Sequence, residues 1–354
     1  MTTAEQQVPL DEATLQAFLG QVIGDWGGTL GCALAAIGDR LGLYAALQTG
    51  PLTVDELAAC TRTTPRYIRE WLLNQAAGGY VRYDPQTDRY TLPPEHAAVL
   101  GQAAGGFRLM LALVRAEPRI AEAFHTGAGM LWGEHDAGLF EGTERFFRSG
   151  YEQHLVQRWI PALDGMPAKL AAGATVADVG CGHGTSTIIM AQAFPQARFF
   201  GFDNHPPSIV RAREAAEAAG VAERVIFEVA AAHQYPVAAS AGYDLIAFFD
   251  CLHDMGDPVG ALRHAADSLA TDGTVLLVEP MAGERIEDNL NPLARVSAGA
   301  SVLTCTPNAL ASGGRALGTL ASETALRTVA AEAGLRHFRR AAETPFNRVF
   351  EAKL

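Results

Sequence analysis

The chain has 354 residues, of which 49% are hydrophobic, so it is long enough and apolar enough to build two or three domains with their own cores. This composition excludes a disordered or fibrous protein. The formal net charge of −12 would repel a phosphate backbone, which makes nucleic acid a poor candidate partner.

The segment from Met1 to Phe18 is acidic and lacks the basic and apolar regions of a secretory signal. The most apolar stretches, 27–37 and 274–278, are shorter than the roughly 18 residues that cross a bilayer, so we expect no membrane-spanning segment. Five cysteines without CxxC spacing predict neither a disulfide framework nor a zinc knot. Together these features favour a cytoplasmic protein.

Residues 1–100 contain the pattern of a winged helix, with three helices followed by a two-stranded hairpin. Threonine and proline residues mark the starts of the second and third helices, and paired glycines end the third. The predicted elements are helices over Ala33–Leu47, from Leu52 and from Pro65 to Gly78, and strands over Tyr80–Tyr83 and Arg89–Leu92.

A winged helix suggests DNA binding, and Arg62, Arg66 and Arg69 would supply positive charge on the third helix. Residues 1–100 nevertheless carry 11 acidic and 6 basic side chains, whereas a DNA reader needs a basic face. We therefore predict a dimerisation module and a homodimer.

Residues 101–172 are predicted to be a mostly helical connector. A glycine-bearing stretch over Gly127–Gly142 interrupts it and carries Trp132, His135 and Phe140. This stretch is either a substrate lid or a packed connector, and the sequence leaves both interpretations open. The helical run that follows offers Tyr151, His154 and Trp159 as candidate substrate contacts.

Residues 173–354 alternate strands with helices, which indicates an α/β domain built on a parallel sheet. A helix over Glu323–Ala333 and two final strands complete the predicted domain. The predicted strands are Thr175–Val179, Arg198–Asp203, Val225–Val229, Tyr243–Phe249, Thr274–Glu279, Leu335–Ala341 and Asn347–Ala352.

The first of these strands leads into a glycine loop that reads Gly180-Cys181-Gly182-His183-Gly184. A dinucleotide site needs G-x-G-x-x-G, but Thr185 stands three positions after Gly182. Asp178 would also lie beneath a diphosphate, so its charge suits an ammonium ligand better. Asp203 ends the next strand, where a carboxylate can accept hydrogen bonds from both hydroxyls of a ribose. The alternative for the glycine loop is that it forms a tight structural turn and binds no ligand.

The loop, Asp203 and the strand pattern resemble class I S-adenosylmethionine-dependent methyltransferases. With the N-terminal region, the resemblance narrows to actinobacterial and plant-type small-molecule methyltransferases that carry an N-terminal dimerisation domain. It implies a seven-stranded Rossmann-like sheet with one antiparallel strand, and S-adenosylmethionine as the cofactor. The cofactor-binding residues it implies are Asp178, Gly180, Gly182, Gly184, Thr185, Asp203, Asn204, Ala230, Ala231, Asp250 and Cys251.

One departure concerns the adenine. Many members of this family place an acid after the third strand to hold the adenine amino group, but here Val229 is followed by Ala230-Ala231-Ala232-His233. We therefore expect backbone amides or apolar contacts to read the base.

The fourth strand of the domain ends in Asp250-Cys251-Leu252-His253-Asp254, with Asp257 three residues later. This run resembles the segment of plant-type O-methyltransferases in which the histidine is the general base, and Glu279 matches the acid that orients it. Met281 is a further candidate substrate contact. The second orienting acid of the family is not matched, because Leu320 stands in its place.

Three alternatives remain for this segment. His253 could lie near the cofactor without transferring a proton, or the run His253-Asp254-x-x-Asp257 could bind a metal, although acids at a helix start more often cap it. Cys181 and Cys251 could also take part in thiol chemistry such as arsenic methylation. The default interpretation is that both are buried apolar side chains. Cys305 falls in the long insertion after the fifth strand, where this fold often builds its acceptor pocket.

The sequence thus predicts an enzyme that methylates a hydroxyl of a small, aromatic or polyketide-like molecule, without a metal. The alternatives are methylation at carbon or nitrogen, or a protein of the same fold that does not methylate. Such a protein would be a cofactor-sensing DNA-binding regulator, or an enzyme that uses the sulfonium as a positive charge.

Overall fold

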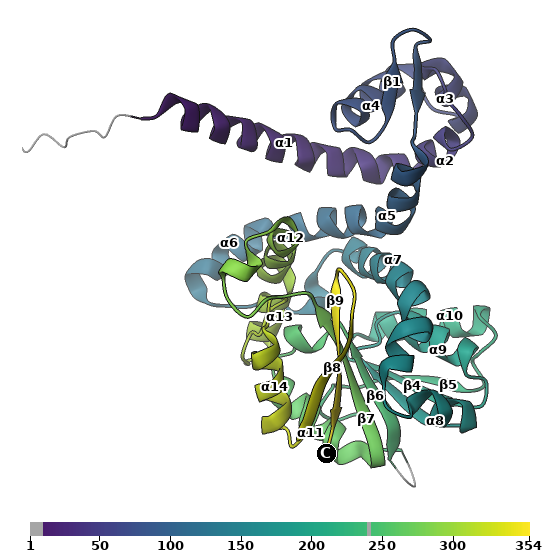
Figure 1. Cartoon of the computed structure of the whole chain (residues 1–354), viewed down its shortest axis with the longest axis vertical. Coiled ribbons are helices and arrows are strands. Elements are labelled where there is room, and N and C mark those ends of the chain that lie inside the picture. Colours follow the sequence, from purple (N-terminus) through teal and green to yellow (C-terminus); the bar gives the residue numbers. More distant parts are fainter. Residues whose placement is uncertain (1–9, 239–241) are drawn as a thin grey trace, which may run out of the picture. The chain divides into compact units, whose positions relative to one another are not determined.

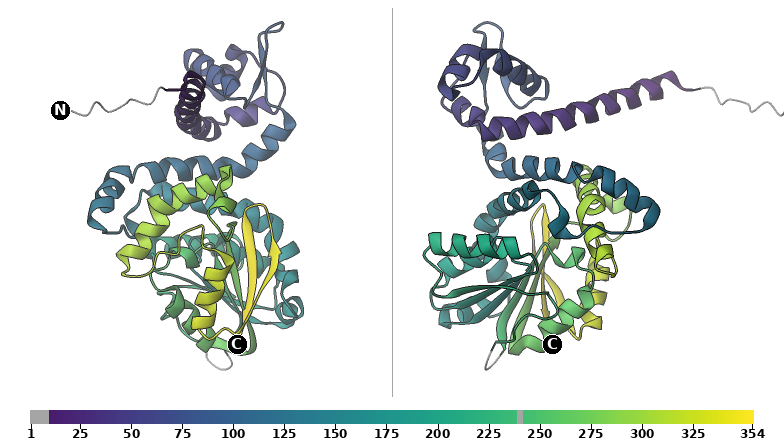
Figure 2. Two further views of the ribbon diagram at one scale, coloured as in Figure 1. Left: turned by 60° about the vertical axis from the view of Figure 1, so that its left-hand side comes forward. Right: turned by 180° about the vertical axis from the view of Figure 1, so that it is seen from behind.

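The computed structural model describes residues 10–238 and 242–354 and divides the chain into two compact units, 1–111 and 112–354. In the first unit, four helices precede a hairpin, and a fifth helix follows it (Figure 2). Their bounds are α1 (Glu12–Arg40), α2 (Leu43–Leu47), α3 (Val54–Thr61), α4 (Pro65–Ala77), β1 (Arg82–Asp84), β2 (Arg89–Thr91) and α5 (Pro94–Val114).

Local sequence explains most of these elements. The side chain of Thr53 accepts a hydrogen bond from the Glu56 N–H while Glu56 accepts one from the Thr53 N–H, a capping box that starts α3. The predicted helix over Ala33–Leu47 is wrong in two respects. It is split at Gly42, which has a φ of 70°, and α1 begins at Glu12, where Asp11 caps it. The glycines inside α1 concealed this long helix from a propensity argument.

One helix among the described residues, α5, is long and apolar enough to cross a membrane by length and composition alone. The sequence analysis overlooked this stretch. Core helices of soluble proteins meet the same criterion, so the finding does not by itself identify a membrane protein.

The second unit begins with helices that lead to the sheet. Two stretches of the unit, η2 and η6, are π-helices, which widen the helix by one residue per turn. The bounds are α6 (Glu117–Thr126), η1 (Trp132–Glu134), α7 (Ala137–His154), η2 (Leu155–Trp159), η3 (Ile160–Ala162) and α8 (Met166–Ala172), with η5 (Glu287–Asn289), α12 (Pro292–Ala300), η6 (Ser301–Cys305) and α13 (Thr306–Ala311) after the fifth strand of the sheet.

The sheet has seven strands in the order β5-β4-β3-β6-β7-β9-β8. The first five strands in this order are parallel, and β9 runs antiparallel to both of its neighbours. This confirms the predicted α/β fold class, with its seven-stranded sheet and one antiparallel strand. The strands are β3 (Thr175–Val179), β4 (Arg198–Asp203), β5 (Val225–Val229), β6 (Tyr243–Phe249), β7 (Leu269–Pro280), β8 (His337–Glu343) and β9 (Asn347–Lys353).

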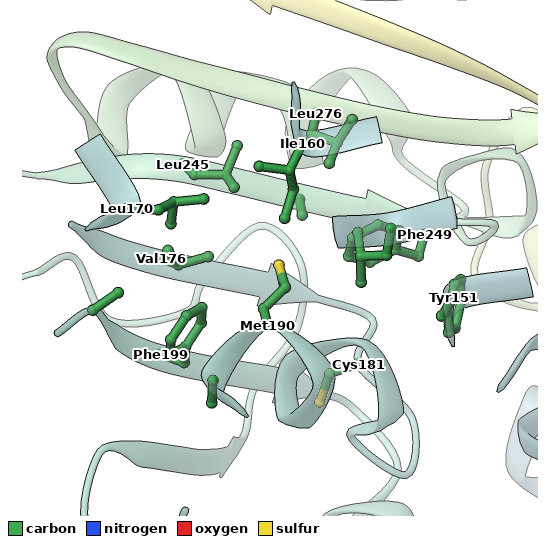
Figure 3. Packing of buried hydrophobic residues seen from close by; sticks show 14 of the residues in the cluster. Tyr151, Ile160, Leu170, Val176, Cys181, Met190, Phe199, Leu245, Phe249 and Leu276 are labelled. Atoms are coloured by element: carbon green, nitrogen blue, oxygen red, sulfur yellow. The ribbon is translucent and has the colours of Figure 1, made fainter. Parts of the chain in front are cut away.

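Helices cover both faces of this sheet, with α9 (Thr185–Ala193) and α10 (Pro206–Ala218) on one side and α11 (Pro258–Ser268) and α14 (Glu323–Glu332) on the other (Figure 1). Alternate residues of each strand enter the two cores. Figure 3 shows one core, which Val176, Leu245 and Leu276 of neighbouring strands form together with Ile160 and with Met190 of α9. Parallel strands covered on both faces bring their carboxyl ends to one open edge, where a ligand can bind.

Candidate functional site

A pocket of about 190 Å³ lies at the carboxyl ends of β3, β4 and β6. It lies at the topological switch point of the sheet, between β3 and β6, where the order in which successive strands are added reverses. Open α/β folds bind their ligands at this point. Many of the predicted cofactor residues and one of the predicted substrate contacts are on its wall. These residues are Tyr151, Gly180, Gly182, Thr185, Asp203, Asn204, Ala230, Asp250 and Cys251.

Asp178 lies behind this wall and is fully buried. Its Oδ2 accepts hydrogen bonds from the hydroxyls of Ser186 and Thr187, both at 2.6 Å, while its Oδ1 has no partner among the described residues. Burial raises the pKa of Asp178 to about 6, although the two hydroxyls oppose the shift. An unpartnered buried carboxylate oxygen is suited to receive a cationic donor such as the ammonium of an amino acid.

Asp203 ends β4 and is held by the backbone of two loops. Its Oδ2 accepts the Gly182 N–H at 2.9 Å and its Oδ1 accepts the His205 N–H at 2.8 Å. Burial raises the pKa of this carboxyl, and these two backbone hydrogen bonds counteract the rise. Each oxygen keeps one lone pair free, so the carboxylate can still accept from the two hydroxyls of a ribose.

The glycine loop uses its glycines for different reasons. A Cβ at Gly182 would meet open space, so this position leaves room beside the pocket. At Gly184, with a φ of 77°, a Cβ would lie 2.4 Å from the Phe227 ring. Gly184 therefore serves close packing at the start of α9, away from the pocket wall, whereas the sequence analysis expected all three glycines to face the ligand.

The wall opposite the loop is apolar and aromatic. Ala230 and Ala232 line it, whereas Ala231 does not, and no acid follows β5 to hold an adenine amino group. Trp132 and Phe140 also line the pocket, and Phe140 stacks on the ring of His205 with 4.5 Å between the ring centres. Flat apolar surfaces of this kind fit the faces of a purine.

The stretch over Gly127–Gly142 is packed against the insertion that follows β7. The Met130 N–H donates to the Pro307 C=O at 3.0 Å, and the Trp132 N–H donates to Oδ1 of Asn308 at 2.9 Å. Trp132 is nevertheless part of the pocket wall. The structure thus combines the two interpretations, since a packed connector contributes pocket residues.

His253 and Glu279 are brought together as the resemblance implied. Nδ1 of His253 lies 2.7 Å from Oε2 of Glu279, and both side chains are buried behind the pocket wall. Burial lowers the pKa of His253, but Glu279 and the adjacent Cys305 outweigh it and hold this pKa well above its usual value. Because Nδ1 faces a carboxylate, Nε2 is the nitrogen that remains for chemistry.

Further acidic groups follow β6. Asp250 has a φ of 51°, and its Oδ1 accepts a hydrogen bond from Nδ2 of Asn347 at 2.6 Å, while its Oδ2 has no partner within residues 10–238 and 242–354. Burial, reinforced by Glu279, raises the pKa of Asp250 well above its usual value, and burial raises the pKa of Asp254 to about 7. A cation in this pocket would therefore be strongly favoured.

Four other predicted residues have different placements. Trp159 is a core residue, 1% exposed, and its ring stacks on Phe249. His154 lies beside Trp159 on the same side of the sheet, and Met281 donates its N–H to the Phe346 C=O at 2.7 Å. None of these three is on the pocket wall. Asp257 caps α11 by accepting the Gly260 N–H, so it does not join a metal site with His253.

A different group of donors does come together. One ligand atom each of His253, Asp254 and Cys305 lies within 4.8 Å of the other two. Cys305 was expected near the acceptor pocket, but no spacing pattern connects it to His253 in the sequence.

Several residues of the pocket wall were not predicted from the sequence, among them Glu144 and Asn308. Glu144 of α7 accepts a hydrogen bond from the Thr185 hydroxyl at 2.9 Å and lines the cofactor side. Asn308 lines the opposite side and donates from Nδ2 to the Asp254 C=O at 2.8 Å. Neither residue belongs to a motif, and each reaches the pocket from a helix that is distant in the sequence.

Two family models match the chain. Residues 170–334 match a methyltransferase domain, and residues 29–102 match an Rv2258c-like winged HTH domain. The chain thus combines a methyltransferase domain with a winged HTH domain. The methyltransferase domain contains the glycine loop, Asp203 and His253, which confirms the predicted family and its cofactor.

Known proteins support this assignment. The chain is 31% identical over 156 residues to 27-O-demethylrifamycin SV methyltransferase of Amycolatopsis mediterranei, a match that covers 44% of this chain and 55% of that protein. The chain thus matches about half the length of this curated relative.

Two solved methyltransferase structures share the fold over nearly the whole length of this chain. The mitomycin 7-O-methyltransferase MmcR covers 97% of it with a TM-score of 0.71 and 20% identity, over 100% of its own length. CalO1, a methyltransferase in calicheamicin biosynthesis solved in its S-adenosylhomocysteine-bound form, covers 98% of it with a TM-score of 0.66 and 20% identity, again over 100% of its own length.

Proposed function

We propose that this protein transfers the methyl group of S-adenosylmethionine to a hydroxyl group of a small molecule. The observation that carries the proposal is that Asp203 lines the pocket with a carboxylate able to accept from ribose hydroxyls, while Asp178, buried behind the same wall, has one oxygen without a partner among the described residues. The printed names of two similar proteins, an O-demethylrifamycin methyltransferase and a mitomycin 7-O-methyltransferase, favour an oxygen acceptor.

When bound, S-adenosylmethionine supplies a methyl group on a positively charged sulfur. Asp178 would hold the ammonium of the cofactor, and Asp203 would hold its ribose hydroxyls. His253 would take the acceptor proton at Nε2, with Glu279 fixing the ring through Nδ1. A protonated ring accepts no proton, so His253 must be neutral when the acceptor binds.

The direct test is incubation of the full chain with methyl-labelled S-adenosylmethionine and a panel of phenols, aliphatic alcohols, amines and thiols. We expect label on oxygen, identified by mass spectrometry of the products, and at least about tenfold less labelled product with Asp203→Ala at a subsaturating cofactor concentration. Label on nitrogen, carbon or sulfur alone would contradict the proposed acceptor.

We also propose that the protein is a cytoplasmic homodimer. Its five cysteines are free, which suits a reducing compartment. Along one side of α1, large apolar side chains at helical spacing are exposed, a surface that a second copy would cover. These residues are Leu15, Leu19, Ile23, Trp26 and Leu30, from 41% to 64% exposed.

Light scattering tests the dimer. We expect the mass of two chains for the native protein and of one chain for the double variant Trp26→Glu, Leu30→Glu. The variant Tyr67→Glu, which changes an exposed aromatic residue of α4, serves as the control and should remain dimeric. A native monomer would refute the homodimer.

A further inference from the structure

The donors His253, Asp254 and Cys305 come from two segments that meet only in the folded chain. His253 and Asp254 are in η4 (Leu252–Asp254), and Cys305 ends the π-helix η6. Their ligand atoms lie within 4.8 Å of one another. Metal–ligand bonds of about 2.0–2.3 Å place the ligands of a tetrahedral zinc ion about 3.3–3.8 Å apart, so a contraction of about 1 Å per pair would close the site.

Glu279 prepares the histidine for coordination. Its Oε2 contacts Nδ1 of His253 at 2.7 Å, which leaves Nε2 for a metal, the carboxylate–histidine arrangement that orients most metal-binding histidines. Cys305 hydrogen-bonds the same histidine side chain. The second oxygen of Glu279, Oε1, is buried and has no hydrogen-bond partner among the described residues. A cation nearby would compensate this negative charge.

We propose that His253, Asp254 and Cys305 form a binding site for a soft divalent cation such as Zn²⁺. One sulfur, one imidazole nitrogen and one carboxylate oxygen select Zn²⁺ or Co²⁺ over Mg²⁺ and Ca²⁺, which prefer oxygen ligands. On binding, the Cys305 thiol and the protonated ring of His253 each lose a proton to solvent, and the Cys305 sulfur and Nε2 of His253 bond the ion. Asp254 lines the pocket, which gives the ion a path to the site and leaves a fourth position open.

The ion would act as an inhibitor. This consequence rests on the proposed function, because the ion would occupy the same Nε2 that is proposed to accept the acceptor proton. Metal binding itself does not depend on that role, so the two proposals can fail separately.

Cobalt provides a direct readout of the site. We expect the full chain, freed of metal with a chelator, to bind one equivalent of Co²⁺ and to show the near-ultraviolet charge-transfer band of a cobalt–thiolate bond, which Zn²⁺ then displaces. Cys305→Ser should abolish this band, and Asp254→Asn should weaken Co²⁺ binding at least about tenfold. Glu279→Gln should weaken it about 10- to 100-fold, the usual effect of losing the partner of a ligating histidine.

Cys60→Ser is the matched control, because Cys60 is an exposed cysteine of the first unit, and this variant should bind Co²⁺ as the native chain does. Circular dichroism verifies that each variant is folded. If Cys305→Ser fails to fold, Asp254→Asn tests the metal site instead. Its charge-transfer band should need at least about tenfold more Co²⁺ to appear and should still be displaced by Zn²⁺. Absence of a thiolate band in the native chain, or its persistence in Cys305→Ser, would overturn the proposal.

The inhibition is measured separately, as the activity of each protein relative to its own metal-free rate. One equivalent of Zn²⁺ should abolish native methyl transfer, a chelator should restore it, and Cys305→Ser should need at least about tenfold more Zn²⁺. A cobalt band without inhibition would refute the inhibitory role and the assignment of His253 as the base, but not the metal site.

Discussion

The two ends of the pocket are built in different ways. At the cofactor end, Asp178 and Asp203 stand at the ends of adjacent strands, and their partners belong to the loops and the helix that directly follow those strands. At the other end, His253 depends on Glu279, 26 residues later, and on Cys305 in the insertion beyond β7. Under the proposed function, the residues that would hold the cofactor are positioned by the sheet itself, whereas the end with the proposed base relies on long-range packing.

The largest effect should come from His253→Ala. If this side chain is the base, the rate of methyl transfer to an acceptor whose own pKa is well above the assay pH should fall about 10²- to 10⁴-fold. Cofactor affinity by calorimetry should stay nearly unchanged, because the cofactor end does not depend on this residue. If His253→Ala lost affinity for S-adenosylmethionine as much as it lost rate, the cofactor end would depend on His253 and the two ends of the pocket would not be independent.

Asp203→Ala should affect the other end. Loss of two charge-assisted hydrogen bonds to a ribose should weaken S-adenosylmethionine binding by about 1.5–3 kcal/mol, roughly 10- to 150-fold, as measured by calorimetry. Asp203→Asn keeps one acceptor oxygen for the loop and should lose less. Unchanged affinity in both variants would place the ribose elsewhere.

Asn308 links two segments that line the pocket, since it accepts from the Trp132 N–H and donates to the Asp254 C=O. Asn308→Ala should lower kcat about tenfold by releasing both segments. Asn308→Asp keeps the acceptor and loses the donor, so it separates the two bonds. Asn291→Ala, which removes the cap of α12 and a hydrogen bond to the Asp288 C=O, is the control and should alter kcat less than twofold.

The smallest effect is a pH dependence at Asp178. Its pKa is raised to about 6 in the folded chain, so the folded state keeps a proton that the unfolded state has lost, and stability falls as pH rises from about 4 through 6. The cofactor ammonium needs the charged form, so affinity should rise up to about tenfold per pH unit until about pH 6 and then level off. Asp178→Asn should flatten this rise in a calorimetric series.

The sequence was sufficient for the sheet because β3, β4, β5 and β6 are short apolar runs with clear turn residues, and their predicted bounds are confirmed. Asp178 and Asp203 could be assigned because strand ends of a parallel sheet meet at one edge. By contrast, the part of α1 before Ala33 was missed because its glycines argue against a helix. The place of Cys305 depends on how a long insertion folds back, which no local pattern encodes.

The π-helix that ends at Cys305 suggests how the chain acquired its thiol beside the histidine. A π-helical turn arises when one extra residue is accommodated within an α-helix. Removing a residue from Ser301–Cys305 would restore the α-helical register and rotate one flank of the helix about 100° relative to the other, since each residue turns an α-helix by that angle. A thiol in this position can therefore be gained or lost by a single codon insertion or deletion, without any change in the sheet that binds the cofactor.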